Sequence, residues 1–116
     1  MPQPSAPRAV ATVQVDNDAV RVTEWRFAAG AATGHHRHEY GYVVVPMSTG
    51  RLAITSAEGV ATSELVIGQA YFRPPGAEHD VRNANAQEFV FVEIELKSLA
   101  LTPLEAPPLT PHGGAR

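Results

Sequence analysis

Two groups of histidines are the residues of this chain best suited to chemistry. The first group is His35, His36 and His38, and the second is His79 alone. Side chains two residues apart on a strand point to the same face, so His36 and His38 should share a face while His35 points outward. A third imidazole from another strand would complete a cup of three nitrogens with open coordination positions. We therefore predict that a divalent transition metal binds to His36, His38 and His79.

The segment before His79 favours this geometry. Pro75 and Gly76 suit the two central positions of a type II turn, because proline presets φ and glycine accepts a positive φ. Such a turn would deliver His79 at the start of a new strand. The first histidine group alone could be a solvated patch that binds metals weakly, and the second group is what favours a true site.

Two further side chains are candidates for catalysis or binding. Tyr42 could be a hydrogen-bonding group or phenolate ligand in the pocket, or a core aromatic with its hydroxyl at the rim, which we favour. Arg73 could bind a substrate carboxylate with two hydrogen bonds, although a surface arginine is the simpler interpretation. Asn83 has the parity of His79 and could either orient that ligand or be a polar residue at the strand end.

The elements that would position these residues are strands. Turn signals such as Asp16-Asn17-Asp18 recur at short intervals, and no segment shows a 3.6-residue apolar period with helix caps. We expect strands at residues 9–15, 20–27, 42–45, 52–55, 60–65, 71–72, 79–83 and 89–96. The pattern predicts an all-β barrel or sandwich with little helix.

Two of these strands carry predictions about their faces. In residues 20–27 the apolar positions change parity near Thr23 and Glu24, which we interpret as a bulge or a change of exposed face. In residues 89–96 one parity is predicted to be the core face, and it comprises Val90, Val92, Ile94 and Leu96. The other parity is predicted to be a partly covered outer face with an aromatic dimer contact, and it comprises Phe89, Phe91, Glu93 and Glu95.

Both histidine groups lie in segments that resemble the paired signature of the cupin superfamily. The motifs are Gly30-(X)5-His36-X-His38 and Gly68-(X)5-Pro74-X-Gly76-(X)2-His79-(X)3-Asn83. The second motif matches at every defining position. The first lacks the glutamate usually found after its second histidine with three or four residues between them, where this chain has Tyr42 and Val43. The resemblance implies a double-stranded β-helix, which is a relative of the jelly roll.

The length of 116 residues fits one domain. We expect the barrel to span residues 9–101, after an N-terminal arm of residues 1–8 that holds three prolines. Residues 102–116 contain several prolines and a Gly-Gly pair and should form a C-terminal tail.

The absent motif glutamate has a chemical consequence. Three neutral imidazoles would leave the double charge of the metal uncompensated, so the site should favour an anionic ligand such as hydroxide, a carboxylate or an enolate. Such a site also chooses among iron, nickel, manganese, copper and zinc less sharply than one that includes an acid.

Composition excludes several classes of protein. Charged residues make up 18% of the chain and the net charge is −3, so neither nucleic acid nor a membrane is an expected partner. The chain has no cysteine, so any metal must be bound by nitrogen and oxygen. The N-terminal residues contain no apolar core of a signal peptide, and we expect a cytoplasmic protein.

The resemblance implies a metal-dependent enzyme acting on a small, anionic organic molecule. Three-histidine cupins include thiol and β-diketone dioxygenases, which makes oxygenase chemistry the leading expectation. The alternatives are a metal- or ligand-binding cupin without turnover and a metal-free isomerase with a histidine as general base. The segments around both motifs are also similar to small cupins associated with β-alanine degradation. Small cupins of this type pair through their outer sheet, so we expect a homodimer.

Overall fold

Strands make up all the regular secondary structure in residues 6–100, the part of the chain that the computed structural model describes. They are β1 (Val10–Asp16), β2 (Val20–Phe27), β3 (His36–Arg37), β4 (Tyr40–Pro46), β5 (Gly50–Ser56), β6 (Gly59–Leu65), β7 (Tyr71–Arg73), β8 (Glu78–Asn83) and β9 (Phe89–Ala100). Every predicted strand is present, and the expectation of an all-β barrel with little helix is confirmed. Within this range, no helix could cross a membrane.

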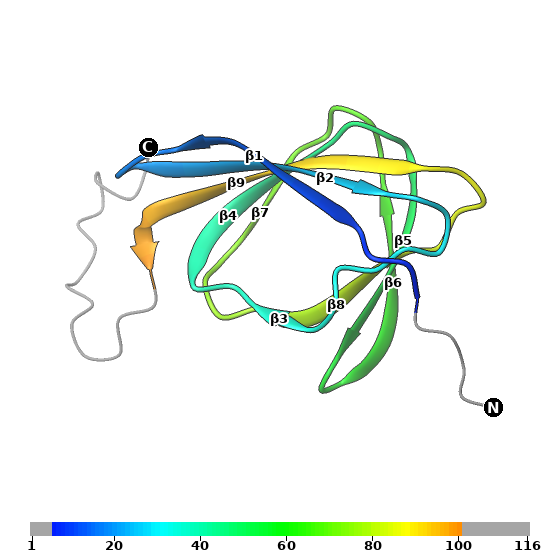
Figure 1. Ribbon diagram of the computed structural model, residues 1–116. Helices are drawn as coiled ribbons and strands as arrows, with labels where there is room; N and C mark the ends of the chain where they lie inside the picture. Colours follow the sequence, from blue (N-terminus) through cyan, green and yellow to red (C-terminus); the bar gives the residue numbers. More distant parts are fainter. Residues whose placement is uncertain (1–5, 101–116) are drawn as a thin grey trace.

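The strands form two antiparallel sheets that enclose the core (Figure 1). The larger sheet has the order β1-β2-β9-β4-β7, and the smaller has the order β3-β8-β5-β6. Because β9 pairs with both β2 and β4, the last strand lies in the middle of the larger sheet. The smaller sheet carries two of the three predicted metal ligands, on β3 and β8.

The core side of β9 is the opposite of the predicted one. Phe89, Phe91, Glu93 and Glu95 are all buried, whereas the alternate residues Val90, Val92, Ile94 and Leu96 are only half-buried. Hydrophobicity favoured the wrong side, because one parity is entirely aliphatic whereas the buried parity includes Glu93 and Glu95. The aromatics predicted to make a dimer contact instead fill the barrel, where Phe91 packs against Phe27 with ring centroids 5.4 Å apart.

The predicted bulge in β2 is absent, because β2 and β9 pair in continuous register from Val20 to Phe27. The irregularity lies in β1, between Val13 and Val15. The inward side of β2 changes from aromatic to polar along its length because Arg21 and Thr23 lie opposite Glu95 and Glu93. The barrel therefore has an apolar half and a polar half.

The outer face of the larger sheet is also apolar. One row of cross-strand neighbours runs over all five strands, and we call it the outer apolar row: Val15, Val22, Ile94, Val43 and Phe72. Phe72 is 51% exposed and Val15 is 42% exposed.

The N-terminal segment joins the barrel at Ala32. The amide of Ala9 donates to the Ala32 carbonyl at 2.9 Å, and the Ala32 amide donates to the Pro7 carbonyl at 2.8 Å. Most of the predicted arm (residues 1–5) and the predicted tail of residues 102–116 lie outside the described residues.

Candidate metal centre

The three predicted histidines lie close together, at the pairing of β3 with β8 and just after β3. His36 on β3 and His79 on β8 are direct cross-strand partners. His38 follows β3, and its backbone is held by the turn before β8: its amide donates to the Ala77 carbonyl and its carbonyl accepts from Gly76, both at 2.8 Å. Gly76 has φ of 103°, as the predicted turn requires.

The three rings converge through their Nε2 atoms. Nε2 of His38 lies 3.0 Å from Nε2 of His36 and 3.2 Å from Nε2 of His79. The rings meet edge to face, at interplanar angles of 70° to 83°. Nitrogen ligands about 2.1 Å from a common ion, at angles near 90–109°, would be about 3.0–3.4 Å apart. The donor set therefore fits a metal ion, and these three residues form one of the groups able to hold one.

The tautomer of His36 suits ligation. Its Nδ1 donates to the Gly34 carbonyl at 2.8 Å, and because a carbonyl only accepts, the proton is on Nδ1. The Nε2 atom thus presents a lone pair to the other two rings. Metal-binding histidines are commonly oriented by such a bond from the second ring nitrogen.

Burial keeps the other two ligands neutral. Desolvation, followed by the nearby rings, lowers the pKa of His38 to about 3. Desolvation followed by His36 lowers the pKa of His79 to about 4. Neutral imidazole is the form that binds metal, so these ligands need not lose a proton near neutral pH.

Tyr42 is a core aromatic, as favoured, and it also supports a ligand. Its side chain is 2% exposed, and its ring stacks on His38 with centroids 4.0 Å apart. Burial raises the pKa of Tyr42, which opposes a phenolate. The stacking fixes the ring plane of His38.

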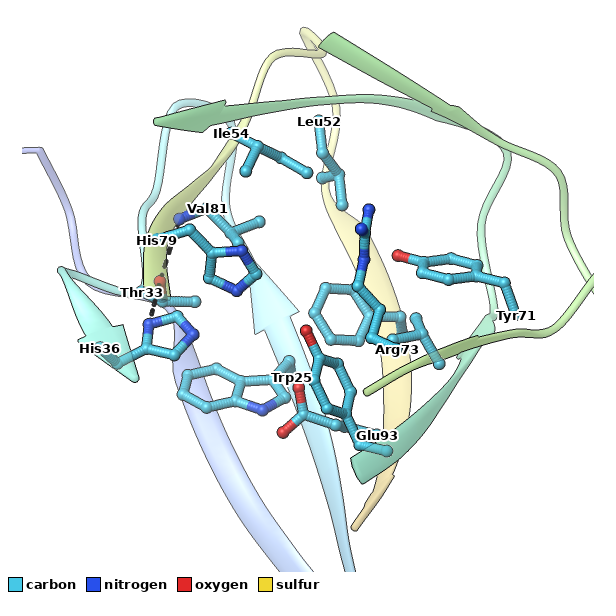
Figure 2. Close-up of a pocket in the computed structure, with 13 residues that line it drawn as sticks. Trp25, Thr33, His36, Leu52, Ile54, Tyr71, Arg73, His79, Val81 and Glu93 are labelled. Carbon is cyan, nitrogen blue, oxygen red and sulfur yellow. Dashed lines mark hydrogen bonds between the residues drawn. The ribbon is translucent and has the colours of Figure 1, made fainter. Parts of the chain in front are cut away.

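Arg73 lines the cavity, contrary to the preferred surface interpretation. It is half-buried on β7 beside Tyr42 of β4, and its guanidinium lies 5.6 Å from the centroid of the Tyr71 ring. Figure 2 shows it extending into the same space as His79. Among the described residues it forms no ion pair within 4.0 Å, so its charge is available to a bound anion.

The cavity that these side chains share is narrow, with a volume of about 20 Å³. Apolar side chains form much of its wall: Val44, Leu52, Ile54, Val81 and Phe91. Histidines, arginine and a carboxylate supply the polar positions (Figure 2). A space of this size has room for an ion or a water molecule, whereas a wider space of about 370 Å³, which Arg73 and His79 also line, has room for a small organic molecule.

Two carboxylates near the histidines were missed by sequence reasoning. Glu93 and Glu95 are each 8% exposed, and one oxygen of each lies within 4.8 Å of the other and of a ring nitrogen of His38. The expectation of an uncompensated metal charge considered only the motif position, where the glutamate is indeed absent, and did not consider these two carboxylates near His38. The signal was present in the sequence as polar residues of one parity in β2 and β9, at Arg21, Thr23, Glu93 and Glu95.

The two carboxylates differ in their partners. Glu95 accepts two hydrogen bonds from Arg21, at 2.6 and 3.1 Å. Burial raises the pKa of Glu93 to about 7, with a smaller contribution from Glu95, and the Trp25 indole partly offsets the shift. Glu93 is therefore only partly ionised near neutral pH before any cation binds.

Two other residues singled out in the sequence, His35 and Asn83, do not take part in the metal site. His35 points outward as predicted, with its side chain 64% exposed and its Nε2 3.4 Å from Glu78. Asn83 is a polar residue at a strand end, and it does not orient His79. Its amide donates to the carbonyls of Phe27 and Gln87, at 3.2 and 2.8 Å.

Comparison with known proteins agrees with this architecture. The chain is 60% identical over 91 residues to the β-alanine degradation protein BauB of Pseudomonas aeruginosa, a match that covers 78% of this chain and 96% of BauB. A crystal structure of a cupin domain from Bordetella pertussis Tohama I is 55% identical, with a TM-score of 0.81 over 82% of this chain and 99% of that one. No family profile matches the chain.

More distant structures share the fold. A protein with a double-stranded β-helix domain from Klebsiella pneumoniae is 21% identical with a TM-score of 0.67, and the match covers 84% of each chain. An RmlC-like cupin from Methanocaldococcus jannaschii is 13% identical with a TM-score of 0.64, covering 83% of this chain and 86% of that one. The chain belongs to the cupin superfamily of double-stranded β-helix proteins, in the same family as BauB.

Proposed function

We propose that this protein is a metal-binding cupin in which His36, His38 and His79 hold a divalent transition metal. The observation that carries the proposal is the convergence of three Nε2 atoms at 3.0 and 3.2 Å, with the His36 proton directed to Gly34. An all-imidazole donor set suits iron, nickel, manganese, copper or zinc.

The ligand of this centre is a small organic anion. Arg73 brings an unpaired guanidinium to the cavity that His36 and His79 line, and a guanidinium can bind a carboxylate with two parallel hydrogen bonds. Ile54 lines the wider space beside Arg73 and His79 and would contact the carbon skeleton there. Arg73 then fixes the orientation of the anion relative to the histidines.

The reaction class that we infer is dioxygenase-type chemistry on a small carboxylic acid. A metal held by the three histidines would supply Lewis acidity toward substrate oxygens or, as iron, the capacity to activate dioxygen. The similarity to BauB, a protein named for β-alanine degradation, supports acids derived from small amino acids as the first substrates to test.

The metal-free isomerase alternative is less consistent with the electrostatics. A general base works best with a pKa near the working pH, whereas burial lowers the pKa of His38 to about 3 and of His79 to about 4. A binding protein without turnover would need the same metal and anion sites, and kinetics separate it from an enzyme.

Elemental analysis of protein purified without an affinity tag tests the metal site. We expect near-stoichiometric metal in the native protein and its loss in His36→Ala and His79→Ala. His35→Ala is the matched control, because it removes an exposed imidazole next to a ligand and should keep the metal. Absence of metal under every loading condition would contradict the proposal.

Oxygen consumption by iron-loaded protein then tests turnover, with a panel of β-diketones, thiols and small amino-acid-derived acids. Loss of activity on chelation is expected, and activity that survives chelation would favour the metal-free isomerase. Binding of a carboxylate without any turnover would favour the binding protein.

Substitution of Arg73 tests the anion site. Hydrogen bonds to charged groups contribute about 1.5–3 kcal/mol, so Arg73→Gln should weaken carboxylate binding by roughly 10- to 100-fold. Calorimetric titration of metal-loaded protein measures this change, with the exposed Arg82→Gln as control. Equal carboxylate affinities in the two variants would show that Arg73 does not bind the anion.

A further inference from the structure

Two buried carboxylates lie on the inward face of β9, outside the three-histidine set. Glu93 and Glu95 have the same exposure, 8%, and both are within reach of His38. They differ in charge balance. Glu95 is held by the guanidinium of Arg21 through two hydrogen bonds, so its charge is already compensated within the protein.

Glu93 has no such partner. No lysine or arginine of the described residues lies within 4.0 Å of its carboxylate. Its cross-strand neighbours are Thr23 on β2 and Val44 on β4, which carry no charge. The Trp25 indole is a neutral partner, and the guanidinium of Arg21 is engaged by Glu95, so Glu93 has no cation of its own. A carboxylate that is more than nine-tenths buried is costly to ionise unless a cation is supplied.

The direction of Glu93 indicates where that cation belongs. The residue lines the same cavity as His36 and His79, and one of its oxygens lies within 4.8 Å of a ring nitrogen of His38. In Figure 2 its carboxylate lies beside the indole of Trp25. The cavity thus has three convergent imidazoles and, within reach of one of them, His38, an acid without a cation of its own, which together form a complementary set for a divalent cation.

We propose that Glu93 is the carboxylate of this metal centre, supplied by β9 instead of the motif position that Tyr42 occupies. Its negative charge stabilises the ion that the three histidines hold. The proposal rests on the metal-binding function proposed above. It also implies that the centre carries a lower net positive charge than the three-histidine motif alone would give.

The affinity of Glu93→Gln for metal tests this role. The substitution keeps the shape of the side chain and removes its charge. Carboxylates that support a metal centre typically contribute 10- to 100-fold in affinity, and we expect a loss in that range for Zn²⁺ or Co²⁺. Trp25 is the single tryptophan and lines the cavity, so quenching of its fluorescence by Co²⁺ reports occupancy directly.

A matched control separates this effect from net charge. Glu64→Gln changes the net charge by the same amount at an exposed position on β6, where Glu64 pairs with Arg51 at 2.7 Å, and should bind metal like the native protein. Glu93→Asp keeps the charge and should bind more tightly than Glu93→Gln. The melting temperature of each metal-free variant shows whether it remains folded, and the visible spectrum of bound Co²⁺ should differ between native protein and Glu93→Gln.

The outcomes distinguish the two proposals. If the native protein and His36→Ala bind metal equally, the proposed three-histidine site is contradicted, and so is the proposed role of Glu93, which rests on it. If His36→Ala loses the metal while Glu93→Gln stays within about threefold of native affinity, the histidine site stands and Glu93 is an ordinary buried acid. An affinity loss for Glu93→Gln of tenfold or more, with Glu64→Gln unchanged, supports the proposal.

Discussion

The proton on His36 is the smallest feature on which the proposed site depends. Gly34 fixes it on Nδ1 through a 2.8 Å hydrogen bond, and Nε2 is left to face the other two rings. The stacking of Tyr42 on His38 constrains a second ring. Two of the three ligands are therefore oriented by neighbours that themselves need no metal, which reduces the rotamer entropy that binding must overcome.

The titration of the buried groups gives a pH dependence for the metal-free protein. His38 and His79 have folded pKa values of about 3 and 4, below the usual 6.5, so only the unfolded chain binds their protons between about pH 4 and 6.5. Glu93 has a raised folded pKa of about 7, so only the folded chain binds its proton between about pH 4.5 and 7.

We expect the free energy of unfolding of the metal-free protein to rise between about pH 4.5 and 6.5. In this range the unfolded chain binds two protons, at His38 and His79, that the folded chain does not, and the folded chain binds one, at Glu93, that the unfolded chain does not. The net difference of one proton raises the free energy of unfolding by about 1.4 kcal/mol per pH unit. Urea unfolding at several pH values measures this slope. Glu93→Gln should roughly double it, and a flat profile in both proteins would contradict the assigned shifts.

At the scale of the elements, β9 organises the barrel. Its inward side begins with Phe89 and Phe91 in the apolar half and continues with Glu93 and Glu95 in the polar half. Because it pairs with β2 and β4 on either side, one strand supplies both core and site. The same division explains the position of Arg21, which is half-buried at the polar end of β2, where Glu95 compensates its charge.

Asn83 stabilises the end of β8 through side-chain hydrogen bonds to neighbouring backbone groups. Its amide satisfies the backbone carbonyls of Phe27 and Gln87, and its oxygen accepts from the Asn85 amide at 2.9 Å. Asn83→Ala leaves these groups without a buried partner, and we expect a loss of about 2–4 kcal/mol in the free energy of unfolding.

Urea unfolding checks this expectation, with Gln87→Ala as control because the Gln87 side chain is exposed while its carbonyl is retained. Metal content of folded Asn83→Ala should match that of the native protein, because Asn83 bonds to loop backbone and not to His79. Loss of metal in a fully folded variant would instead make Asn83 a residue that orients the ligand.

At the scale of the whole molecule, the outer face of the larger sheet remains uncovered in one chain. The outer apolar row crosses five strands without a charged residue, from Val15 to Phe72. We propose that a second copy of the chain covers it in a homodimer. The contact involves the aliphatic side of β9 and not Phe89 and Phe91, which are inside.

Light scattering coupled to gel filtration tests the dimer. The native protein should have twice the chain mass of 12.4 kDa, and Val22→Glu should yield monomers because it places a charge within the row. Val60→Glu on β6 is the matched control, since Val60 is 70% exposed on the other sheet. A native protein that is monomeric at tens of micromolar would refute the dimer.

The amino-acid sequence by itself determined the strands, the turn at Gly76 and the identity of the converging histidines. These features depend on local rules: alternation with a period of two, and the backbone preferences of proline and glycine. The parity that set His35 aside held, since His35 is exposed beside Glu78 whereas the Nε2 atoms of His36 and His38 lie 3.0 Å apart.

Only the tertiary structure decided which face of β9 is buried and which acid reaches the histidines. Alternation defines two faces of a strand, and hydrophobicity favoured the aliphatic one, but the face that is buried depends on how the sheets pack. Glu93 and His38 are far apart in the sequence and meet only because β9 pairs with β4 and faces the turn before β8. The charge environment of the site is therefore a property of the closed barrel.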